Sequence, residues 1–92
     1  MGTYMGGSAP AMARQICDGF TLISGPLLKR LSAEQMETLE WELEKRLRET
    51  RGTVVPTDDQ PAVQERNRRI SRIGGALRVL RHTKQQRRMG RF

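Results

Sequence analysis

Four apolar residues recur at the spacing of an α-helix in the middle of the chain, and they constrain the fold more than any other feature. They are Met36, Leu39, Leu43 and Leu47. At 100° per residue these positions fall within about 80° of arc on a helix. So narrow a stripe suits packing against a single neighbouring helix.

Capping signals bound this helix on both sides. Ser32 is a favourable N-cap, and Gln35 stands three residues further on, as a capping box requires. Gly52 predicts a C-terminal stop in the left-handed conformation. The sequence therefore predicts a helix over residues 33–51.

A second apolar pattern follows a connection that is bracketed by two prolines, Pro56 and Pro61. Its seam residues are Val63, Ile70 and Leu77 at a spacing of seven, with Ile73 and Leu80 between them. This heptad pattern predicts a helix over residues 61–86, although Arg66 occupies one seam position. Gly74 and Gly75 interrupt the pattern and each cost about 1 kcal/mol relative to alanine. We expect one helix that these glycines allow to bend.

Two amphipathic helices joined by a short connection predict an all-α fold, an antiparallel two-helix hairpin over residues 31–86. Residues 1–30 predict an irregular arm, because glycine and proline punctuate residues 1–26. Residues 87–92 predict a basic tail that frays unless it is bound. Only 36% of the 92 residues are hydrophobic and 4% aromatic. We therefore expect stability to come partly from a partner, a second copy or nucleic acid.

The net charge of +7 is distributed unevenly along the chain. Residues 62–92 contain ten bases and one acid, whereas residues 31–51 contain four bases and six acids. Arginine forks match phosphate oxygens, and a glycine on the same face allows close approach. We predict RNA contacts, mainly to phosphates, at Arg68, Arg69, Arg72, Gly75, Arg78, Arg81, Lys84, Arg87 and Arg88. An acidic protein, or a solvated face that pairs with acids of the first helix, is the alternative.

Three large apolar residues lie outside the predicted seams and are candidates for partner binding: Trp41, Phe20 and Leu22. Trp41 sits about 140° from Met36 around the first helix. Its position suits the core of a helix dimer, the surface of a protein partner, or stacking on a base or ribose. Phe20 and Leu22 belong to a short apolar patch of the arm that would dock on a partner.

The sequence offers no catalytic set, no metal-binding set and no feature that calls for a cofactor, so we do not expect an enzyme. His82 is the only histidine, and no carboxylate, serine or cysteine is spaced to act with it. Cys17 is the only cysteine, which indicates a free thiol in a reducing compartment. No run approaches the roughly 18 apolar residues of a membrane span, so we expect no membrane partner. The N-terminus is poor in acids, which leaves a mitochondrial import signal open.

Two stretches, "LSAEQMETLEWELEKRLRETR" and "NRRISRIGGALRVLR", resemble ribosomal protein twenty-nine of the large subunit. The resemblance covers residues 27–84. In that family the second helix carries a basic run, an Ile-x-x-Ile pair and an aliphatic pair before a final basic stretch. The matching positions here are Arg68 and Arg69, Ile70 and Ile73, and Val79 and Leu80. Gly74, Gly75 and a longer loop depart from the pattern.

This resemblance implies a non-catalytic two-helix hairpin on large-subunit RNA near the peptide exit. The surroundings of Trp41 resemble mitochondrial members, so the implied location is the ribosome, in the cytoplasm or in mitochondria.

The sequence thus predicts a non-enzymatic RNA-binding structural component of a ribonucleoprotein, which also contacts neighbouring proteins. A small homodimeric helical regulator or inhibitor is the alternative, of the phage or plasmid type that binds nucleic acid or transcription machinery. The narrow seams and Trp41 favour it, since two hairpins would form a four-helix bundle. A basic helix on a membrane surface is a third interpretation, disfavoured because the apolar face of the second helix lacks aromatic residues.

Overall fold

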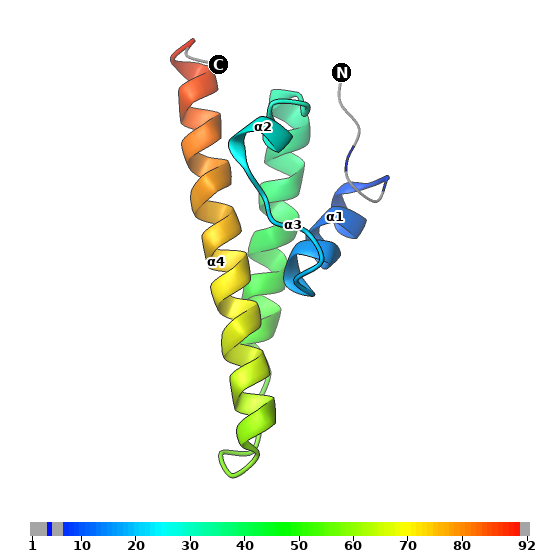
Figure 1. Cartoon of the computed structure of the whole chain (residues 1–92), viewed down its shortest axis with the longest axis vertical. Helices are drawn as coiled ribbons and strands as arrows, with labels where there is room; N and C mark the ends of the chain where they lie inside the picture. The colour runs from blue at the N-terminus through cyan, green and yellow to red at the C-terminus, as the bar shows by residue number, and fades with distance from the viewer. Residues whose placement is uncertain (1–3, 5–6, 91–92) are drawn as a thin grey trace.

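A computed structural model describes Tyr4 and residues 7–90, and this part of the chain is all-helical, without strands. Its four helices are α1 (Ala9–Cys17), α2 (Gly25–Leu28), α3 (Ala33–Gly52) and α4 (Gln60–Arg88). In Figure 1, α3 and α4 lie side by side and run in opposite directions, and α1 packs across the side of α3. The ends of the predicted arm and tail, residues 1–3, 5–6 and 91–92, lie outside the described residues.

The capping box predicted at the start of α3 is confirmed. The Ser32 hydroxyl accepts from the Gln35 backbone N–H at 3.1 Å, and the Gln35 side chain accepts from the Ser32 N–H at 2.8 Å. The left-handed stop predicted at Gly52 is wrong, because Gly52 is the last helical residue and its φ is not positive. Thr53 ends the helix in an extended conformation instead.

Arg66 performs the capping that Gly52 was expected to provide. From α4 its guanidinium donates to the backbone carbonyls of Arg51 at 2.8 Å and of Thr53 at 3.2 Å. The last carbonyls of a helix lack intrahelical partners and carry the negative end of the helix dipole, so a cation there is stabilising. The apparent defect in the heptad seam is thus a cross-helix cap.

α4 spans 29 residues and passes through Gly74 and Gly75 without a break (Figure 1). Asp59 begins it as N-cap by accepting from the Ala62 N–H at 3.2 Å, with a proline in the first turn. Burial on both sides of the two glycines holds the helix together there, since Ile73, Ala76 and Leu77 are all buried.

The prediction that residues 1–30 form an irregular arm is wrong for α1 and α2. Ser8 caps α1 by accepting from the Ala11 N–H at 3.2 Å. Gly19 ends the helix in the left-handed region, with φ of +82°. There the Phe20 N–H reaches the Gln15 carbonyl at 2.9 Å, the bond of a Schellman motif. A left-handed glycine thus does end a helix in this chain, but at α1 and not at α3.

The core lies where α1, α3 and α4 meet, and α2 closes one end of it. Its buried residues are Met12, Ala13, Ile16 and Cys17 from α1; Leu28 and Leu31 from α2 and the turn after it; Met36, Leu39 and Leu43 from α3; and Ile73, Ala76, Leu77 and Leu80 from α4. Three predicted seam residues nearer the connection, Leu47, Val63 and Ile70, are only partly buried. Figure 1 shows why, since α1 and α2 both lie toward the other end of the pair.

Candidate nucleic-acid interface

α4 contains nine lysine and arginine residues and one acid, Glu65. These bases differ in what they contact inside the protein, and that difference decides which remain available to a ligand. They divide into those facing α3, those facing α1, and those on the outer surface.

The bases facing α3 join the two long helices. Arg81 donates to carboxylate oxygens of Glu40 and Glu44, both at 3.0 Å, and Lys84 donates to Glu40 at 2.5 Å. Burial raises the pKa of Glu40, but the hydrogen bonds from Lys84 and Arg81 outweigh it and hold that pKa below its usual value. Two predicted RNA contacts therefore already have carboxylate partners.

Two further predicted contacts hold the C-terminal end of α1. Arg69 Nη1 lies 2.8 Å from Asp18 Oδ1, and Arg72 Nη1 donates to the Cys17 carbonyl at 3.1 Å. Both side chains therefore lie where α1 packs against α4. A cation at a helix C-terminus interacts favourably with the dipole, which explains the attachment.

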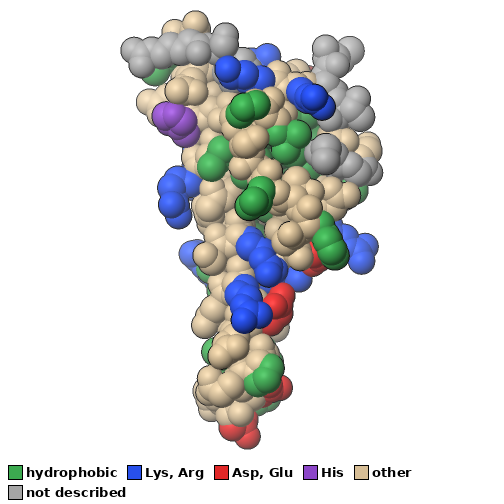
Figure 2. Space-filling model, in the orientation of Figure 1, with side chains coloured by type: hydrophobic (Ala, Val, Ile, Leu, Met, Phe, Trp, Pro, Cys, Tyr) green, Lys and Arg blue, Asp and Glu red, His purple; other side chains and the backbone are tan. Residues whose placement is uncertain are grey.

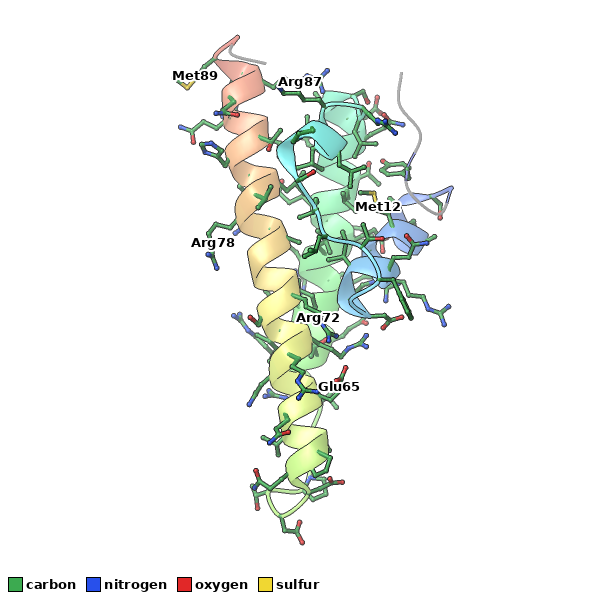
Figure 3. All side chains as sticks on the ribbon, viewed as in Figure 1. Met12, Glu65, Arg72, Arg78, Arg87 and Met89 are labelled. Carbon is green, nitrogen blue, oxygen red and sulfur yellow. The ribbon has the colours of Figure 1, made fainter. Side chains whose placement is uncertain are left out.

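The remaining predicted contacts are more open. Arg87 donates to the Leu31 carbonyl at 2.6 Å, and Arg68 lies 3.9 Å from Glu65 on its own helix. Arg78 and Arg88 are exposed and make no hydrogen bond or ion pair with the described residues. In Figure 3, Arg78 projects outward from the middle of α4, away from the other helices.

A groove of about 550 Å³ lies beside Arg78, between residues 19–23 and the middle of α4. Leu22 and Ile23 line it from the loop, while Gly75 and Val79 line it from α4. Its volume falls in the range of about 300–1,000 Å³ that is typical of small-ligand sites. The described residues that line it include Arg72 and Arg78 but no acid, so it is suited to an anionic ligand with an apolar part.

The three residues predicted for partner binding are exposed. Trp41 on α3 has 55% of its surface accessible, and the Lys45 ammonium lies 5.0 Å from its ring centroid, a cation–π contact. Phe20 and Leu22, in the loop after α1, are 82% and 93% accessible. Leu22 lines the groove together with Arg72 and Arg78, a proximity that no local sequence pattern indicates.

Figure 2 shows lysine and arginine side chains over the upper and middle parts of the visible face, while the acids visible there lie in its lower half. In the described part of the chain, no three histidine, cysteine or acidic residues are grouped so that they could hold a metal ion. None of the helices formed by those residues has the length and hydropathy to cross a bilayer. Comparisons of the chain with protein-family models, curated proteins and solved structures give no match.

Proposed function

We propose that this protein is a non-enzymatic RNA-binding component of a ribonucleoprotein, and that the outer face of α4 is its RNA-binding surface. The observation that supports this most directly is that some bases of α4 form no ion pair with acids of the protein itself. Acids outside α4 form ion pairs with Arg69, Arg81 and Lys84 of α4. Arg78 and Arg88 have no such partner among the described residues.

Exposed arginines on a rigid helix can bind phosphates at low cost in conformational entropy, because the backbone is already ordered. Arg68, Arg78 and Arg88 are spaced ten residues apart, so each lies about 80° further around α4 than the one before it. Their Cα atoms therefore extend over roughly 30 Å of helix axis. Such a length suits contact with several phosphates and gives affinity that falls as salt is raised.

Within this class, we propose the large ribosomal subunit as the assembly, on the strength of the family resemblance of residues 27–84. The bases that close α3 against α4 would then stabilise the protein, and those on the outer face would bind RNA.

The RNA-binding proposal is tested by measuring binding of labelled RNA across a salt series. The variant Arg78→Gln is expected to lower the slope of log K against log salt by about one. Arg48→Gln is the matched control, because Arg48 is also exposed, lies on α3 and has no partner among the described residues. The proposal fails if the wild type binds RNA no better than a neutral helical protein, or if both variants lower the slope equally.

Membership of the ribosome is tested separately by sedimentation of the tagged protein from native lysate, with and without ribonuclease. Comigration with a large ribonuclease-sensitive particle is expected. A small species that ribonuclease leaves unchanged would contradict the ribosomal assignment.

A homodimeric helical regulator is the second candidate, and the exposure of Trp41 and Phe20 favours it. Large exposed apolar residues often mark protein interfaces. Sedimentation equilibrium of the purified protein at micromolar concentration distinguishes the two, since the regulator would have dimer mass.

A further inference from the structure

Gly74 and Gly75 are adjacent in the middle of α4, where helix propensity disfavours glycine. A Cβ built on either residue would meet nothing within 4 Å, so packing inside the protein does not require glycine at either position. The two differ in their surroundings, because only Gly75 lines the groove between residues 19–23 and α4. The absence of a side chain at Gly75 keeps that wall of the groove open.

The groove combines an apolar interior with cationic side chains. Ile16 and Ala76, which are buried core residues, contribute to its lining together with Ile23 and Val79. Arg72 and Arg78 also line it, and six residues of helix separate them by about 9 Å along the axis. Both contacts that Arg72 makes, with the Cys17 carbonyl and with Glu65, use Nη1. Arg78 has no partner among the described residues.

We infer that this groove binds one unpaired nucleotide of an RNA single strand, with the base against the apolar lining and phosphates at Arg72 and Arg78. This inference rests on the proposed function and adds the form of RNA that is recognised. A base in a duplex is stacked on both faces and cannot enter a groove, whereas a base in a loop or bulge can be turned out. Leu22 also lines the groove and is largely exposed, so it would contact the face of the base.

An apolar cleft also fits a protein segment, but charge favours the nucleotide. The described residues of the lining carry two guanidinium groups and no carboxylate. A nucleotide supplies a planar ring with apolar faces and an anion within one residue, which matches both features.

The test uses the full-length protein and fluorescence anisotropy with two RNA probes of equal length, a single strand and a duplex, in moderate salt. The variant Gly75→Leu fills the groove without changing charge. Gly74→Leu is its control, since it makes the same substitution on the adjacent residue, outside the groove. Circular dichroism and thermal unfolding verify that both variants fold.

The wild type is expected to bind the single strand about tenfold more tightly than the duplex, the effect of burying one base against the aliphatic lining. Gly75→Leu is expected to abolish that preference, and Gly74→Leu to retain it. If the wild type binds neither probe, the proposed function itself fails. If it binds both equally and neither variant changes this, RNA binding stands and the groove inference is overturned. If Gly75→Leu alone changed the protein from a dimer to a monomer, the groove would bind a second copy of the chain. That result would also overturn the nucleotide inference.

Discussion

The α3–α4 pair and the N-terminal region, residues 8–28 with α1 and α2, are held in place by different means. The pair has long helices of 20 and 29 residues, an apolar seam that Arg66 interrupts, and ion pairs across it. The N-terminal region has helices of nine and four residues, which are too short to be stable alone in water. Its order depends on the surface against which it docks.

Docking of α1 combines apolar burial with polar contacts at both of its ends. Met12 and Ile16 are almost fully buried against the pair. Near the start of α1 the Pro10 carbonyl accepts from Arg46, and at its end Asp18 and the Cys17 carbonyl meet Arg69 and Arg72. Basic residues of α4 thus also hold the C-terminal end of α1 in place.

The largest expected effect compares the two regions directly through the same substitution in each. Ile16 in α1 and Ile73 in α4 are 2% and 0% accessible. Because both leave a cavity in the same core, Ile16→Ala and Ile73→Ala should each destabilise the protein by about 2–4 kcal/mol. Urea unfolding followed by circular dichroism measures both. A loss below about 0.5 kcal/mol for Ile16→Ala alone would mean that α1 is a surface attachment.

A smaller effect, of opposite sign in the two regions, is expected from glycine substitutions. Gly19 has φ of +82°, and an added Cβ would lie 3.1 Å from Arg72 Cζ. Gly19→Ala should therefore cost about 1–2 kcal/mol. Gly74→Ala should stabilise by up to about 1 kcal/mol, because α4 there is helical and open. Thermal unfolding of the two variants measures both changes in stability. Stabilisation by Gly19→Ala would contradict the left-handed conformation of the residue that ends α1.

The contrast between the regions also explains what could be predicted from the sequence. The helices of the pair are long enough to show periodicity, and local caps such as Ser32 with Gln35 mark their ends. α1 gives a weaker signal: Ser8, Pro10, the Met12–Ile16 pair and Gly19 are each compatible with a helix, but glycines and prolines around them suggest a loop. The segment becomes a helix because Met12 and Ile16 are buried against the other helices, and the sequence does not show that contact.

For the candidate site, the sequence gives the arginines but not their partners. Residues 40 and 81, or 18 and 69, are far apart in the chain, and only the packing of helices brings them together. The sequence therefore overestimates the number of bases available to RNA. The groove is equally non-local, because it forms between Leu22 and Ile23 of one segment and Gly75 and Val79 of another.

The ion pair between Glu40 and the bases of α4 predicts a pH dependence of the stability of the α3–α4 pair. The lowered pKa of Glu40 means that its ionised form is stabilised by folding, so its contribution is present above its ordinary pKa and is lost as pH falls through the lowered value. Glu40→Gln should cost about 1–2 kcal/mol at pH 7. The difference from the wild type should shrink in acid, as measured by urea unfolding at several pH values. If the stability difference between the wild type and Glu40→Gln did not change with pH, the loss would come from altered packing and not from the lost charge.

The smallest effect is expected at the ion pair between Asp18 and Arg69, and the Cys17 thiol reports on it. Cys17 is fully buried, and burial raises its pKa, with Arg46 partly opposing that increase. A thiol reagent should therefore modify it only when α1 opens. Asp18→Asn removes about 0.5–1 kcal/mol of attachment and should speed labelling by about two- to fivefold.

Asp58→Asn is the control for this measurement, because it makes the same substitution in the connection before α4, outside the contact with α1. Labelling of the urea-unfolded chains corrects for any change in intrinsic thiol reactivity. If Asp18→Asn labels at the wild-type rate while Ile16→Ala labels faster, apolar burial alone holds α1. Arg69 would then be available to an external phosphate at no cost to the fold, and the basic face of α4 would include one more arginine than the ion pair implies.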